Sequence, residues 1–156
     1  MQRVFLSAAL TLALILALFT VENAFDQPRV LGWFSADKRA EIQLGQHVYQ
    51  ANCAACHGVN LQGQPNWQSP GADGLIPAPP HDETGHTWHH PTDLLFAITK
   101  YGIVEAANLE GYQSAMPAYE GVLTDGEIEA VLSFIKSQWP EELQEQHRRL
   151  DERAQN

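Results

Sequence analysis

Residues 52–60, NCAACHGVN, contain both cysteines of the 156-residue chain, with His57 directly after the second. Four kinds of site use such a pair: a disulfide, a redox dithiol, part of a zinc site, or the attachment point of a covalent cofactor. A zinc site needs further matched ligands, and Cys53 and Cys56 have no second cysteine pair to supply them. A thioredoxin-like dithiol follows a strand and begins a helix, whereas no alternation of strands and helices surrounds this pair.

The cofactor interpretation accounts for all three residues of the motif. On a helical turn Cys53 and Cys56 are three positions apart and His57 is four from Cys53, so the three side chains share one side. Two thiols there can form thioethers to the two vinyl groups of one porphyrin, and the imidazole is left to bind the central iron. CAACH is the attachment signature of c-type haem. A structural disulfide would leave His57 unexplained, so we expect one covalent haem c at these residues.

Length and charge limit the remaining possibilities. The chain has room for one soluble domain of about 120 residues, and a buried porphyrin would supply much of the core that so small a domain lacks. The net charge is −10, and between residues 40 and 135 the acids outnumber the bases by eleven to one, the base being Lys100. The acids are Glu41, Asp73, Asp82, Glu83, Asp93, Glu105, Glu110, Glu120, Asp125, Glu127 and Glu129. Nucleic acid is therefore excluded as a partner, and a redox protein with a basic docking surface is expected.

The N-terminal segment has the pattern of a membrane anchor. Arg3 is followed by eighteen uncharged residues, VFLSAALTLALILALFTV. This run exceeds the apolar core of about 7 to 15 residues in a signal peptide and reaches the roughly 18 of a spanning helix. Cleavage after Ala24 would put Glu22 at the minus-three position, where a small residue is required. We expect residues 1–25 to be a retained transmembrane helix, with the rest of the chain outside the cytoplasmic membrane.

The sequence of the remaining chain predicts helices separated by irregular segments. Residues 26–34 form a short connector, and Ser35 is expected to cap a helix at 36–52 with an apolar stripe that includes Gly45. The segment 58–91 is rich in Gly and Pro and is expected to be a long functional loop.

Two further helices and a tail follow that loop. A short helix begins at Pro91 and is stopped by Gly102. Thr124 and Glu127 form a capping box at the start of the last helix of the domain, which Pro140 ends or kinks. The tail 141–156 is polar all round, and we expect a solvated helical extension rather than a docking element.

A second iron ligand is also expected from the sequence. Apart from Met1, Met116 is the only methionine, and it precedes Pro117 in the irregular segment before the last helix. A thioether from that side would complete a His/Met pair, which raises the reduction potential relative to two imidazoles. We therefore expect His57 and Met116 to be the two axial ligands of the iron.

From 35 to 140 the chain resembles a bacterial class I monohaem c-type cytochrome. The resemblance is carried by CAACH at the end of the first helix, by Met116 with Pro117, and by Gly45 and Tyr49 facing Phe134 where first and last helices would cross. It implies an all-α cytochrome c-like fold of orthogonal helices around a covalent haem. It also implies that a proline carbonyl accepts a hydrogen bond from the His57 imidazole. The candidates are Pro77, Pro79 and Pro80, of which Pro79 is our choice.

The stretch HDETGHTWHHP, residues 81–91, departs from that family pattern. It contains Trp88 and four histidines, namely His81, His86, His89 and His90. In one interpretation Trp88 and a histidine hydrogen-bond the haem propionates, and we take Trp88 as haem-binding on that basis. In others His90 caps the next helix, the cluster binds copper or another metal, or one histidine replaces Met116 as ligand.

These observations predict an electron carrier and not an enzyme, because a haem with both axial positions filled has no site for substrate. We expect one-electron transfer between a quinol-oxidising complex or dehydrogenase and a terminal oxidase or photosynthetic reaction centre. The alternatives are a permanently assembled haem subunit of a larger membrane redox complex, an enzyme or sensor whose distal ligand leaves, and a copper-handling module.

Overall fold

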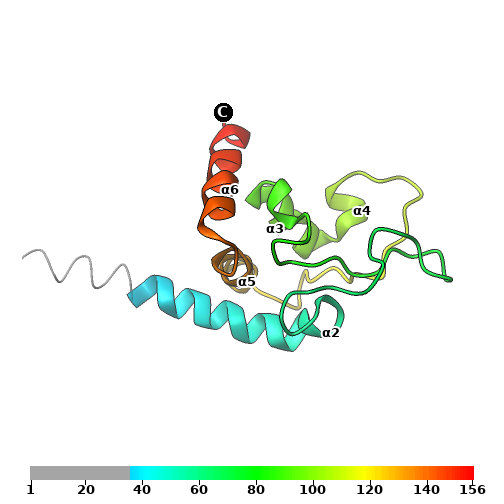
Figure 1. Cartoon of the computed structure of the whole chain (residues 1–156), viewed down its shortest axis with the longest axis horizontal. Coiled ribbons are helices and arrows are strands. Elements are labelled where there is room, and N and C mark those ends of the chain that lie inside the picture. The colour runs from blue at the N-terminus through cyan, green and yellow to red at the C-terminus, as the bar shows by residue number, and fades with distance from the viewer. Residues whose placement is uncertain (1–35) are drawn as a thin grey trace, which may run out of the picture. The chain divides into compact units, whose positions relative to one another are not determined.

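The computed structural model describes residues 36–156, which contain helices and no strand. The helices are a first helix at 36–52, α2 (Ala54–His57), the 3-10 helix η1 (Thr87–His89), α3 (Thr92–Tyr101), α4 (Ile103–Ala106), α5 (Asp125–Ser137) and α6 (Glu141–Ala154). Figure 1 shows their arrangement. The predicted anchor, connector and Ser35 cap lie outside the described residues. Within 36–156, no helix is long and apolar enough to cross a membrane.

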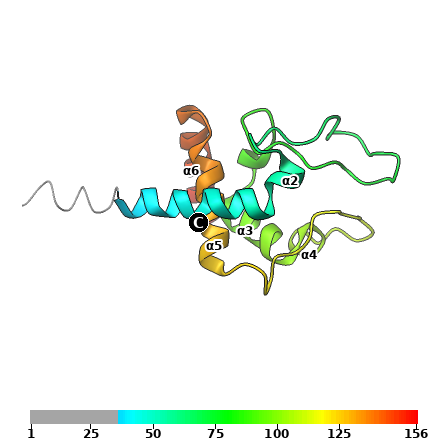
Figure 2. The same ribbon diagram turned by 90° about the horizontal axis from the view of Figure 1, so that it is seen from below.

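The crossing of the first helix with α5 requires a glycine. A Cβ atom at Gly45 would lie 1.9 Å from the carbonyl oxygen of Ala130 and 2.8 Å from Cβ of Phe134. One turn further on, the rings of Tyr49 and Phe134 pack with centroids 5.5 Å apart. The expected contact at Gly45, Tyr49 and Phe134 is therefore confirmed, and Figure 2 shows the two helices crossing.

Helix α5 lies at the centre of the buried core. One cluster joins it to the first helix and to Trp139, and a second joins it to Leu95 of α3. Ile128 and Val131 of α5 are buried almost completely. Each buried side chain of this size contributes roughly 1.5–3 kcal/mol. The core thus holds the end of the first helix, where the CAACH motif begins, against the rest of the domain.

The helix boundaries largely follow the sequence signals. The hydroxyl of Thr124 accepts from the Glu127 N–H, and the Glu127 carboxylate accepts from the Thr124 N–H, so the capping box is confirmed. Helix α3 stops at Gly102, which has a φ of 87°. Helix α4 was not expected, because four residues are too few to show a helical period.

The polar tail packs against the domain, so the expectation of a solvated extension is wrong for one face of α6. His147 is buried, and its Nε2 lies 2.9 Å from the carbonyl oxygen of His90. The Asp151 carboxylate accepts from the N–H of Thr92 at 2.7 Å and from its hydroxyl at 2.6 Å. Helix α3 has no side-chain cap from its own N-cap residue, Pro91, so Asp151 supplies one from α6.

Substituting Asp151 tests this contact. Burial raises the pKa of Asp151, but the hydrogen bonds from Thr92, together with the charges of His147 and Lys136, outweigh burial and hold the pKa below its ordinary value of 3.8. We expect Asp151→Ala to lower the free energy of unfolding by about 2 kcal/mol at neutral pH. A carboxylate with a lowered folded-state pKa stabilises above its unfolded pKa and loses that effect as pH falls. The difference from wild type should therefore shrink below about pH 4 in urea unfolding series.

Glu152→Ala is the matched control for that experiment. It removes an exposed ion pair with Arg148, and we expect a loss of less than about 1 kcal/mol. Equal losses in the two variants, or a difference for Asp151→Ala that does not change with pH, would show that Asp151 does not cap α3.

Candidate functional site

The CAACH motif continues the first helix by one more turn. The N–H of Cys53 donates to the Tyr49 carbonyl at 2.9 Å, and the Cys53 carbonyl accepts from the His57 N–H at 2.9 Å. Gly58, with a φ of 84°, ends the turn. The hydroxyl of Tyr49 donates to the Gly58 carbonyl at 2.9 Å and so ties the end of the turn to the core. The helical spacing that places both thiols and the imidazole together is therefore present.

The two thiols lack the properties of a redox pair. Cys53 and Cys56 are not joined by a disulfide. Burial raises the pKa of the Cys53 thiol to about 11, and the neighbouring Cys56 adds to this effect. A reactive dithiol needs a lowered pKa, because the thiolate is the nucleophile. The raised pKa of Cys53 does not support the redox dithiol interpretation, whereas the spacing of the two thiols on the helical turn suits thioether attachment.

The orientation of His57 is set by a backbone carbonyl. Its Nδ1 lies 2.8 Å from the carbonyl oxygen of Pro79, so among the three candidate prolines this is the one in hydrogen-bond contact. Since a carbonyl can only accept, Nδ1 carries the proton and Nε2 is free to bind iron. Burial lowers the pKa of His57, although the bond to Pro79 opposes the shift, which favours the neutral, metal-binding imidazole.

Two glycines, Gly63 and Gly85, allow the chain to bring Pro79 to His57. Neither was expected from the sequence to have this role. A Cβ at Gly63, whose φ is 66°, would lie 2.4 Å from the Pro80 nitrogen, and one at Gly85 would lie 2.1 Å from the Pro80 carbonyl oxygen. The Gly63 N–H also donates to the His57 carbonyl at 2.7 Å. Only glycine allows the chain to fold so closely around this proline pair. The repeated glycines of the loop were the one sequence signal that could have indicated this close packing.

Trp88 has a buried donor without an acceptor. Within residues 36–156, its Nε1 is the buried side-chain nitrogen or oxygen that has no hydrogen-bond partner. A buried donor left unpaired costs about 1–3 kcal/mol, so the residue fits a site in which an anionic group of a cofactor accepts from it. The indole stacks on the His89 ring at a centroid distance of 3.7 Å. A haem propionate has the chemistry that this donor requires.

The histidines of the loop do not form a metal centre. His81 stacks on His57, while His86 stacks on Trp67 and meets the edge of His90. Within 36–156, no three His, Cys, Asp or Glu side chains gather as a metal site, so the copper interpretation is not supported. The expectation that His90 caps α3 is wrong, because that cap comes from Asp151.

His81 is also unsuited to be the second axial ligand. Its ring lies against the His57 ring at 4.0 Å between centroids, with 22° between the planes. Axial ligands stand on opposite sides of a porphyrin, whereas these two rings are in face-to-face contact. Burial lowers the pKa of His81 well below its usual value, and His57 and His86 lower it further, so the ring is neutral.

Met116 lies half-buried in the irregular segment 107–123. Its N–H donates to the Ser114 hydroxyl at 3.1 Å. Three residues later, the hydroxyl of Tyr119 donates to the carbonyl of Asn52 at 2.6 Å, directly before Cys53. In the view of Figure 2 the segments 58–86 and 107–123 lie on either side of α2. Coordination of iron by Met116 stays a prediction.

Comparison with known proteins agrees with this site. The family profile described as Cytochrome c matches residues 42–139. Cytochrome c6 of Tetradesmus obliquus is 29% identical over 100 residues, which cover 64% of this chain and 92% of that protein. Cytochrome c6 of Pyropia yezoensis is 29% identical over 123 residues, which cover 78% and 89% respectively. No solved structure matches the chain significantly.

The fold, the attachment motif and the profile match define an electron carrier, and the chain belongs to the cytochrome c family. It holds haem c covalently through the thiols of Cys53 and Cys56, in the CxxCH motif that ends at His57. The profile match ends at Trp139, so helix α6 lies beyond the residues that the profile matches.

Proposed function

We propose that this protein carries single electrons on the outer face of the cytoplasmic membrane. Its donor would be a quinol-oxidising complex or a dehydrogenase, and its acceptor a terminal oxidase or a photosynthetic reaction centre. The helical CAACH turn, with His57 held by Pro79, is the observation that carries the proposal. Bound haem supplies a one-electron iron couple. The protein's residues supply the ligands, their orientation and the docking surface.

Met116 is proposed as the second iron ligand. Its half-buried position and the bond from Tyr119 to the end of the first helix support this role. Two protein ligands would fill both axial positions and exclude substrates and small gases. The enzyme or sensor alternative needs the distal ligand to leave, which rapid binding of carbon monoxide by the reduced protein would reveal.

Trp88 is proposed to donate its Nε1 proton to a haem propionate. Support comes from the buried, unpaired state of that atom. Such a bond would fix the edge of the haem and partly neutralise its charge in a site of low polarity.

Attachment to the membrane through residues 1–25 is part of the proposal and rests on their eighteen-residue uncharged run. The short connector at 26–34 would keep the haem domain close to the membrane. The same two features support a second candidate function, a permanently assembled haem subunit of a larger redox complex. Such a subunit should stay with its complex during purification in mild detergent.

The dependence of electron transfer on salt tests the carrier proposal. The acidic domain should dock on a basic patch of its partner, so the second-order rate of transfer should fall on the order of ten-fold between about 0.01 and 0.15 M ionic strength. Stopped-flow kinetics with the purified partner measures this rate. Reduction by an uncharged small molecule is the control and should not change with salt. A rate between the two proteins that is independent of salt would favour the permanently assembled subunit.

A further inference from the structure

One flat face of the iron ligand His57 is covered by a second imidazole. The centroids of the His57 and His81 rings are 4.0 Å apart and their planes differ by 22°. The axial ligand is thus held at its Nδ1 by the Pro79 carbonyl and on its face by His81. No other ring contact in the described residues involves His57.

His81 is itself firmly held. Its Nδ1 lies 2.9 Å from the hydroxyl oxygen of the buried Thr87. Its carbonyl accepts from Nε1 of Trp139 at 2.7 Å, and its N–H donates to the Leu61 carbonyl at 2.7 Å. Tyr49 meets the edge of its ring at 6.2 Å between centroids. The ring therefore has a fixed position from which it can limit the motion of a neighbour.

The two contacts restrain the His57 ring in different ways. The hydrogen bond to Pro79 fixes the tautomer and limits rotation about the Cβ–Cγ bond, because that rotation moves Nδ1, but its tolerance in angle still allows the ring to rock slightly. A flat stack resists that rocking, because rotation would push one edge of the ring into His81. Groups next to a metal ligand commonly set its orientation in this way.

We propose that His81 is a positioning residue that sets the plane of the His57 imidazole relative to the haem. The inference deepens the proposed function and rests on it only through His57 as iron ligand. It assigns a role to a histidine that the plain attachment motif does not require. The part of His81 that matters is its flat ring, while Thr87 serves to hold that ring in place.

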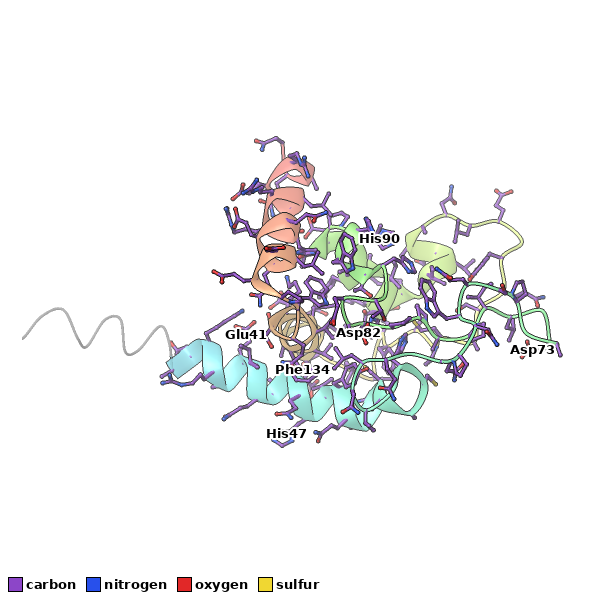
Figure 3. All side chains as sticks on the ribbon, in the orientation of Figure 1. Glu41, His47, Asp73, Asp82, His90 and Phe134 are labelled. Carbon is purple, nitrogen blue, oxygen red and sulfur yellow. The ribbon has the colours of Figure 1, made fainter. Side chains whose placement is uncertain are left out.

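Haem-methyl proton shifts of the oxidised holoprotein test this proposal, because they depend on the plane of the axial imidazole. His81→Leu keeps bulk but removes the flat face, and should change the order or spread of the four methyl shifts. His81→Phe keeps a flat ring and should retain the wild-type order. His47→Leu makes the same chemical change on the exposed side of the first helix, where Figure 3 shows His47 pointing away from the domain, and should have no effect.

The far-red sulfur-to-iron band of the same samples reports separately on Met116, so failure of the Met116 assignment is distinguishable from failure of this proposal. Wild-type methyl shifts in His81→Leu, or equal changes in His81→Leu and His81→Phe, would overturn the role of the flat ring. If His81→Leu yields no holoprotein, His81→Met decides the question. Methionine fills a similar volume without a flat ring, so it should change the order or spread of the four methyl shifts, and an unchanged spectrum would overturn the proposal.

Discussion

Replacing Cys53 and Cys56 together by alanine is expected to abolish covalent haem attachment. The two thiols are the only cysteines of the chain, and they occupy positions three apart on the turn that ends at His57. Without thioethers, only coordination and packing would hold the porphyrin, and these depend on the folded state. Haem staining after denaturing electrophoresis should therefore show no signal at the mass of the polypeptide, whereas wild type keeps its haem.

Single variants provide the control for that experiment. Cys53→Ala and Cys56→Ala each leave one thiol and should retain haem stain at reduced yield. The double variant should also be less stable, because so small a domain depends on the porphyrin for part of its core. Covalently bound haem in the double variant would contradict the assignment of these residues as the tethers.

Gly45→Ala is expected to be strongly destabilising. The added methyl carbon would lie 1.9 Å from the carbonyl oxygen of Ala130, and the first helix and α5 would have to separate to admit it. Overpacking of a core costs about 1–3 kcal/mol and sometimes more, so we expect a loss of about 3 kcal/mol. The total free energy of unfolding of a small domain is roughly 5–15 kcal/mol, so this loss would be a large part of it. Thermal unfolding of the holoprotein should show a clear drop in Tm.

Gly126→Ala is the matched control for the crossing. Gly126 lies in the first turn of α5, and a Cβ there would meet no heavy atom within 4 Å. Alanine should be neutral or stabilise by up to about 1 kcal/mol, since it favours the helix over the unfolded chain. Equal losses of unfolding free energy in Gly45→Ala and Gly126→Ala would show that the close helix crossing is not the reason for a glycine at position 45.

Features that depend on neighbouring residues were predictable from the sequence. The CAACH turn, the capping box at Thr124 and the stop at Gly102 are each encoded within a few positions, and the structure contains all three. The crossing at Gly45 was also expected, although it joins distant parts of the chain. There a glycine within an apolar helical stripe carried the signal, together with the family resemblance.

Contacts across the long loop were not predictable in the same way. Three prolines stood as candidates for the carbonyl that contacts His57, and the fold brings Pro79 there because Gly63 and Gly85 allow close packing. The stack of His81 on His57 depends on the same loop path. No local period encodes such a path, so sequence patterns left the loop histidines with several roles open.

The docking of helix α6 was mispredicted for a different reason. Its docking contacts use His147 and Asp151 beside the apolar contact of Leu143, and a pattern that searches for an apolar stripe does not register the two polar residues. The same polar residues would be equally normal on a solvated helix. A docked and a solvated helix differ in whether hydrogen-bond partners such as Thr92 lie next to these residues, and only the tertiary structure shows that.

The absorption spectrum of the oxidised holoprotein tests the central claim most directly, namely that His57 and Met116 form the axial pair of an electron-carrying haem. We predict a far-red sulfur-to-iron band in the wild type that is lost in Met116→Ala, while haem remains attached through both cysteines. Absence of the band in the wild type, or its persistence in Met116→Ala, would contradict the account.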